Sequence, residues 1–202
     1  MGTPSTVLIV PGLRDHVAQH WQTLLAARLP GAHSVPPMGR EALDCAARVE
    51  AIEQALSAID GPVVIVAHSG GCLAVAHWAA QTRQAGRVRG ALLAVPPDFD
   101  TPLPAGYPAI AALGAAGWFP VPRQRLPFPS LVATSQNDPL AALHRVQALA
   151  SDWGSQTVDL GAVGHLNPAS GYGEWPQAMA LIAALGGGPV QATGRALSAS
   201  SC

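Results

Sequence analysis

Lysine is absent from the sequence, charged residues of both signs are scarce, and only three cysteines are present. Charged residues make up 11% of the 202 residues, and all eleven basic ones are arginine. Because they form no basic stripe, the charge pattern does not predict nucleic-acid binding. Apolar runs stay shorter than the ~18 residues needed to cross a bilayer, and the N-terminus lacks the segments of a signal peptide. We therefore expect a soluble, cytoplasmic protein with no nucleic-acid or membrane partner.

The spacing of cysteine and histidine argues against a disulfide framework or a metal site. Cys45, Cys72 and Cys202 are odd in number and far apart, and they form no CxxC pair. Reduced thiols fit a cytosolic protein best. The seven histidines include no H-E-x-x-H pattern. We therefore expect no metal and no other cofactor.

The chain length suits one domain, since single hydrophobic cores grow to roughly 250 residues. Short apolar runs predict strands at 7–10, 32–35, 63–66, 90–95, 130–134 and 156–159. Periodicity and flanking glycine or proline predict helices at 16–29, 41–59, 69–83, 109–116, 139–150 and 175–185. This alternation favours an α/β fold, with a mostly parallel sheet of about six strands and helices on both faces. We expect the domain to span residues 1–186, with a mobile tail of small residues at 187–202.

Ser69 stands where the strongest predicted strand, 63–66, turns into a helix. Ala67-x-Ser69-x-Gly71 matches the nucleophile elbow G-x-S-x-G, with alanine in place of the first glycine. Small residues are needed there because strand and helix pass closely, and the helix N-terminus directs N–H groups at a developing oxyanion. Ser69 is therefore our candidate nucleophile. The alternative is an ordinary serine N-cap.

Two further residues follow strands in the chain order of a Ser-Asp-His triad. Asp138 follows the strand at 130–134, and His165 follows the last strand between glycines. In parallel sheets such positions gather beyond the carboxyl ends of the strands. The alternative for Asp138 is to cap a helix that starts at Pro139, and Asp98 is the rival acid.

An oxyanion hole requires two backbone N–H groups near the nucleophile. We assign the N–H of Gly70 as the first donor and that of Leu13, in the turn after the first strand, as the second. The alternative is that this turn only ends the strand.

The proline-rich segment 96–129 is long enough to cover a site. We expect Phe99 and Trp118 in it to bind substrate, together with Gly12 and His68. Plain loop packing of these aromatic residues is the alternative.

The motifs occur together over residues 6–186, at 7–12, His20-Trp21, 67–71, 137–139 and 164–167. In this combination they resemble the small serine hydrolases that include retinoblastoma-binding protein 9 and bacterial YdeN-like proteins. The resemblance implies a single-domain α/β-hydrolase fold with a minimal cap, and a triad of Ser69, Asp138 and His165. The nearest match to the L-x-C-x-E motif of the eukaryotic member, at residues 43–47, lacks the glutamate. We therefore expect no retinoblastoma-type partner.

These residues predict a carboxylesterase-like serine hydrolase that cleaves a small ester or amide through an acyl-Ser69 intermediate. Its partner would be a small-molecule acyl substrate. A thioesterase or acyltransferase would use the same triad, and a lyase or a non-catalytic binding module on the same fold are further alternatives.

Overall fold

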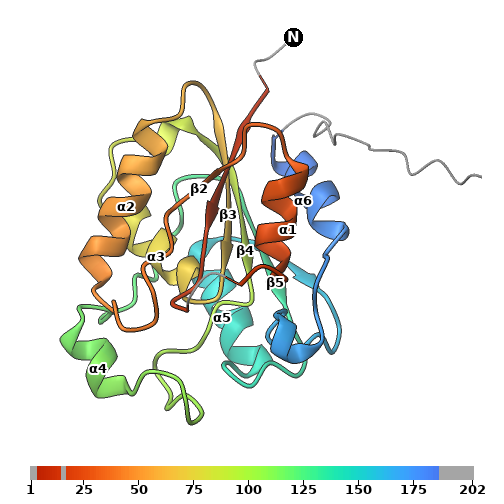
Figure 1. Cartoon of the computed structure of the whole chain (residues 1–202). Helices are drawn as coiled ribbons and strands as arrows, with labels where there is room; N and C mark the ends of the chain where they lie inside the picture. The colour runs from red at the N-terminus through yellow and green to blue at the C-terminus, as the bar shows by residue number, and fades with distance from the viewer. Residues whose placement is uncertain (1–3, 15–16, 187–202) are drawn as a thin grey trace, which may run out of the picture.

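The computed structural model describes residues 4–14 and 17–186, so the tail predicted at 187–202 lies outside the described residues. One sheet stands between two layers of helices (Figure 1). Each pair of neighbouring strands is parallel, and the strand order is β2-β1-β3-β4-β5-β6. The strands are β1 Thr6–Val10, β2 His33–Ser34, β3 Val63–His68, β4 Val88–Ala94, β5 Ser130–Thr134 and β6 Gln156–Asp159. The predicted α/β fold with a six-stranded sheet is confirmed.

Helices α1 and α6 pack on one face of the sheet, and α2, α3 and α5 pack on the other. The helices are α1 Trp21–Arg28, α2 Cys45–Ser57, α3 Gly70–Ala79, α4 Ile110–Ala115, α5 Leu143–Trp153 and α6 Gln177–Gly186, with 3-10 turns η1 Ala85–Arg87 and η2 Pro168–Ser170. Because both faces are covered, β1 and β3 are apolar at successive positions; Leu8 belongs to one core cluster and Ile9 to the other. Within the described residues, no helix is long and apolar enough to cross a membrane.

Three helices begin four or five residues later than predicted, and one of them is α2, which begins at Cys45 and not at residue 41. Helix α1 begins at Trp21 and not at residue 16, which lies outside the described part of the chain; the extended His20 caps it by accepting a backbone N–H on its side chain. Helix α5 begins at Leu143 and not at residue 139. There Asp138 accepts the N–H of Leu140 at 2.9 Å in a tight turn. Asp138 therefore stays in the loop after β5, at the carboxyl edge of the sheet, and does not cap α5.

The proline-rich segment 96–129 packs against the start of α2 and forms a minimal cap. It contains the short helix α4. The N–H of Cys45 donates to the carbonyl oxygen of Ala116 at 2.9 Å, and the indole of Trp118 donates to that of Leu43 at 2.7 Å. These bonds attach the segment to the domain core, and Trp118 is fully buried there.

Candidate active site

Ser69 lies between β3 and α3 in a backbone conformation that few L-residues adopt. Its φ is 56° and its ψ is −132°, a combination that costs of order 1–3 kcal/mol. The side chain makes no cap hydrogen bond to α3, and its Oγ instead lies 2.8 Å from Nε2 of His165. Gly71 has to be glycine because a Cβ there would come within 2.5 Å of the Pro11 carbonyl oxygen. The geometry is that of an elbow and not that of a serine N-cap.

His165 joins Ser69 to a carboxylate on the far side of its ring. Its Nδ1 lies 2.8 Å from Oδ2 and 3.0 Å from Oδ1 of Asp138. The two side chains are 4% and 2% exposed, so this pair is shielded from water. Because Nδ1 faces a carboxylate, it carries the proton of the neutral imidazole, and Nε2 is left to accept the hydroxyl proton of Ser69.

The loop that carries His165 is held by two side chains whose role the sequence did not reveal. The Oγ of Ser170 accepts the His165 N–H at 3.0 Å. The Oδ1 of Asn137 accepts the Gly164 N–H at 2.7 Å. Gly164 has a φ of 58°, and a Cβ there would come within 2.6 Å of the Ser170 Oγ. In the sequence, the glycine before His165 indicated a tight turn at this position, whereas nothing around Ser170 indicated its bond.

His68, directly before Ser69, fixes the carbonyl of His165. Its Nε2 lies 3.0 Å from the His165 carbonyl oxygen. A carbonyl oxygen only accepts, so this nitrogen carries a proton and donates. Burial, followed by the neighbouring His165 and His20, holds the pKa of His68 well below its ordinary value. The ring is therefore a neutral donor, and it also lines the cavity described below.

The two residues predicted to supply the oxyanion donors, Gly70 and Leu13, lie against each other. Gly70 is the first residue of α3, where backbone N–H groups have no acceptor within the helix. The Leu13 side chain covers it, because a Cβ on Gly70 would come within 2.5 Å of Leu13 Cγ. Gly12 lies close to Ser69 as well, since a Cβ added to Gly12 would lie 3.2 Å from the Ser69 Cβ. The turn after β1 thus lies directly over the elbow.

Arg48 of α2 hydrogen-bonds to the carbonyl oxygens of this turn. It was not predicted as a site residue. It is 6% exposed, and its guanidinium donates to the carbonyl oxygens of Gly12 and Leu13 at 3.4 Å each and to that of Ala42 at 2.8 Å. Burial lowers its pKa. In a trans peptide the C=O and N–H groups point in opposite directions, so the bond from Arg48 to the Gly12 carbonyl turns the Leu13 N–H away from α2. The signal of Arg48 in the sequence was that a charged residue stands four positions before the buried Ile52, on the same stripe of the helix.

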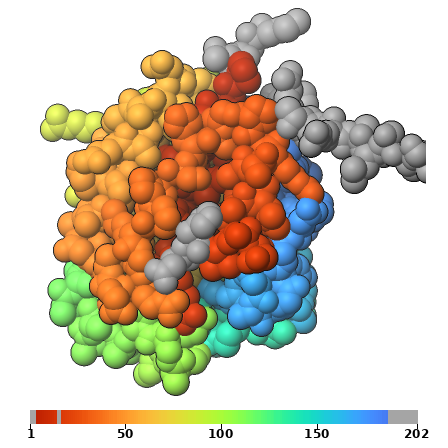
Figure 2. Space-filling view, in the orientation of Figure 1, coloured from red at the N-terminus to blue at the C-terminus, as the bar shows by residue number. Residues whose placement is uncertain are grey.

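A cavity of about 660 Å³ opens over Ser69 and His165. In Figure 2 the surface is hollowed between α1 and the segment after β2. Of the predicted substrate-binding residues, Gly12, His68 and Phe99 line this cavity. Trp118 does not line it, which corrects the prediction for that residue. Its indole is instead buried behind the wall, 5.5 Å from the Phe99 ring and perpendicular to it.

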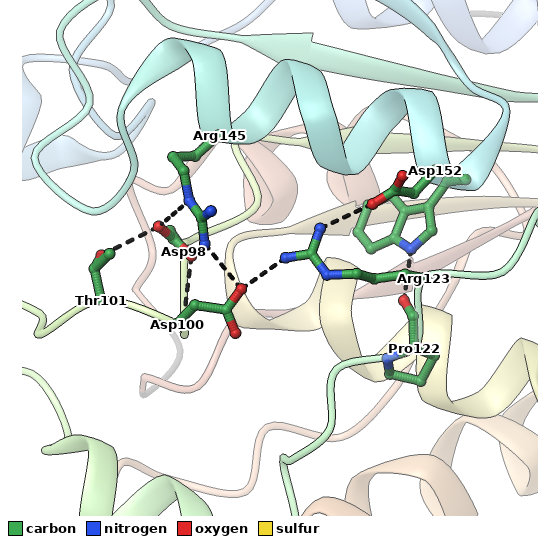
Figure 3. Close-up of polar contacts among 8 residues, drawn as sticks. Asp98, Asp100, Thr101, Pro122, Arg123, Arg145 and Asp152 are labelled. Carbon is green, nitrogen blue, oxygen red and sulfur yellow. Dashed lines mark hydrogen bonds and ion pairs between the residues drawn. The ribbon is translucent and has the colours of Figure 1, made fainter.

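Asp98, the rival acid, is bonded elsewhere. Figure 3 shows it facing Arg145 of α5, whose guanidinium donates to its two carboxylate oxygens at 2.8 and 3.1 Å. Arg145 and Arg123 both also contact Asp100, at 2.9 and 2.7 Å. Burial alone would raise the pKa of Asp98, but hydrogen bonds from Arg145 and the Asp100 N–H hold it below its ordinary value. This network anchors the start of the cap segment to α5, and the carboxylate that meets His165 is that of Asp138.

Comparison with known proteins places this geometry in a family. A hydrolase described as YdeN-like, from Pectobacterium atrosepticum, is 29% identical with a TM-score of 0.77 over 91% of both chains. The ydeN gene product from B. subtilis is 17% identical with a TM-score of 0.68, over 90% of this chain and 98% of that one. The type II thioesterase BorB from the borrelidin biosynthetic cluster is 16% identical with a TM-score of 0.60 over 94% of both. The last two likenesses show the fold alone.

No curated protein matches the chain in sequence. The model of the serine hydrolase family, in contrast, matches residues 7–184. The resemblance to YdeN-like α/β hydrolases is thereby confirmed. The chain belongs to the serine hydrolase family.

Proposed function

We propose that the protein is a carboxylesterase-type hydrolase that cleaves a small ester through an acyl-Ser69 intermediate. The observation that carries the proposal is the continuous hydrogen-bonded row of Ser69, His165 and Asp138, with contacts of 2.8 Å on both sides of the imidazole. Nucleophile, base and orienting acid stand in the order that acyl transfer requires.

In the first half of the reaction, the Ser69 Oγ attacks the ester carbonyl carbon while its proton passes to Nε2 of His165. Asp138 keeps the imidazole in the required tautomer and stabilises its protonated form. The N–H groups of Gly70 and Leu13 bind the oxyanion. As the tetrahedral intermediate collapses, the bond to the alcohol oxygen breaks and His165 returns the proton to the leaving alcohol.

In the second half, water attacks the acyl-Ser69 carbonyl and gives its proton to His165. The carboxylic acid then leaves and the Ser69 hydroxyl is restored. The same steps serve a thioester or transfer to another alcohol, so substrate profiling separates these activities from ester hydrolysis. A binding module would not need the strained φ of Ser69 or a base at hydrogen-bond distance from it.

The test is hydrolysis of p-nitrophenyl butyrate by the wild type and by Ser69→Ala, with the thioester and the anilide of the same acid run in parallel. We expect ester turnover that Ser69→Ala lowers by about 10⁶-fold in kcat, as in other triads. Equal turnover by Ser69→Ala would overturn the proposal, and so would turnover of the thioester alone.

A further inference from the structure

The cavity above Ser69 has walls that are rich in proline and in aliphatic side chains. Its prolines are Pro11, Pro36, Pro37, Pro97, Pro108 and Pro168. Proline has no backbone N–H, so each of these positions removes a donor that a polar substrate would use. Aliphatic and aromatic side chains fill the spaces between them, including Val17, Ala26, Val35, Leu43, Phe99 and Leu103. This surface gains most from contact with an apolar group.

The charged residues of the lining are all exposed. They are Arg14, Arg40 and Glu41. The Arg14 guanidinium donates to the Gly106 carbonyl oxygen at 2.8 Å and lies 4.1 Å from the centre of the Tyr107 ring. Through this contact the turn after β1 meets the cap segment beside the cavity. The buried and half-buried residues of the described lining therefore include no Arg, Asp or Glu.

The edge of the sheet next to the cavity does not suit an extended peptide. Strand addition needs a row of free N–H and C=O groups along an edge strand. The edge strand on this side is β2, which has only two residues, His33 and Ser34. Val35 follows it and bonds to the Ile9 carbonyl oxygen, and Pro36 and Pro37 come next. A peptide chain would find few backbone partners here.

The sheet order places the base and the predicted oxyanion donor of the β1 turn on opposite sides of Ser69. Asp138 follows β5 and His165 follows β6, whereas Leu13 follows β1, on the other side of β3. The leaving oxygen has to lie next to His165, which protonates it. The carbonyl oxygen points to the Gly70 and Leu13 N–H groups on the β1 side, and we assign the acyl group to the part of the cavity beside them. There the cavity continues between α1 and the segment after β2, which is the hollow seen in Figure 2.

We propose that this part of the cavity is an acyl chamber that selects uncharged, medium-chain acyl esters over acetyl esters, dicarboxylic half-esters and peptides. The inference rests on the proposed function. A cavity of about 660 Å³ is in the range that encloses a drug-sized ligand, so an acetyl group leaves most of it unfilled. Each methylene of a longer chain leaves water for the apolar wall, which raises kcat/KM about fourfold per methylene until the chamber is full.

The experiment measures kcat/KM for p-nitrophenyl esters from acetyl to palmitoyl, with a succinyl half-ester as the charged member. The variant is Ala26→Phe, which narrows the chamber from α1, with Ala26→Val as a smaller step. Ala27 is the next residue of α1; it is exposed and absent from the cavity lining, so Ala27→Phe is the matched control. Labelling of Ser69 by a small fluorophosphonate checks that each variant is folded.

We expect kcat/KM of the wild type to rise from acetyl to a maximum between hexanoyl and decanoyl, with the succinyl ester cleaved more slowly than the butyryl ester. Ala26→Phe should flatten this rise and move the maximum to shorter chains, with Ala26→Val in between and Ala27→Phe like the wild type. A wild type that prefers acetyl, or an Ala26→Phe profile parallel to the wild type, would overturn the chamber while leaving ester hydrolysis by Ser69 standing. Absence of ester hydrolysis and of Ser69 labelling would overturn the proposed function itself.

Discussion

Ser69→Gly should give a more stable protein than Ser69→Ala, because only alanine keeps the backbone strain of the elbow. Both lose the Oγ contact with His165 at 2.8 Å. Alanine keeps a Cβ at φ 56° and ψ −132°, which costs of order 1–3 kcal/mol. Glycine removes that cost and adds about 0.5–1 kcal/mol of chain entropy to the unfolded state. The expected difference is about 1 kcal/mol in favour of glycine.

Ser69 is also the N-cap residue of α3, and glycine caps a helix better than alanine does. The control for this effect is Ala142→Gly, because Ala142 is the N-cap residue of α5 and has an ordinary φ of −64°. Any gain from glycine at Ser69 beyond the gain at Ala142 reports the strain.

The assay is equilibrium unfolding in urea at neutral pH, followed by circular dichroism and extrapolated linearly to water. Ser69→Gly should unfold at higher urea than Ser69→Ala, with the same slope. If the two variants unfold together, or if Ala142→Gly gains as much as the glycine at Ser69, then the elbow stores no strain and the reasoning fails.

Three further outcomes follow from the surroundings of the site. Asp138→Asn should lower kcat by about 10⁴-fold, while Asp98→Asn keeps ester turnover, since Asp98 is bonded to a guanidinium. Arg48→Leu should lower kcat more than it raises KM, because the turn that presents the Leu13 N–H loses its carbonyl bonds. The free energy of unfolding of His68→Gln, measured in urea, should fall less on acidification than that of the wild type. Because the folded pKa of His68 is depressed, the unfolded chain binds the proton first, and the wild type loses roughly 1.4 kcal/mol per pH unit below the ordinary pKa while the folded ring stays neutral.

Each of these outcomes has a result that would contradict it, read from ester kinetics for the first two and from urea midpoints for the third. Loss of turnover in a folded Asp98→Asn would return that residue to the reaction. An Arg48→Leu enzyme with unchanged kcat would show that the Leu13 N–H does not depend on Arg48. Parallel losses of stability below pH 6.5 in His68→Gln and the wild type would show that His68 titrates normally in the folded state.

Much of the fold was predictable because buried parallel strands leave a simple apolar signal. The strands at 130–134 and 156–159 have the predicted bounds. Helix starts were less predictable, because they depend on side chains that compete for the same N–H groups. Asp138 before Pro139 is typical of a helix cap. Its carboxylate instead bonds the Leu140 N–H and the His165 ring, and the helix begins only at Leu143.

The candidate site was predictable where spacing along the chain carries the information. The elbow shows in consecutive residues around Ser69, and chain order supplies the acid and the base. Arg48 bonds a turn 36 residues away in the sequence, so the charge on its helix stripe does not show what it holds. Ser170 lies five residues after His165, but a lone serine there marks no bond to the His165 N–H. Trp118 was misassigned because composition cannot tell an aromatic residue that lines a cavity from one that is buried behind its wall.

The most direct test of the central claim is the rate at which a fluorophosphonate modifies Ser69, with the site identified by mass spectrometry of the digested protein. We predict a single modified residue, Ser69, and a rate that falls by orders of magnitude in Asp138→Asn, because the imidazole loses its orienting carboxylate. Modification at another residue, or an equal rate in Asp138→Asn, would contradict the account.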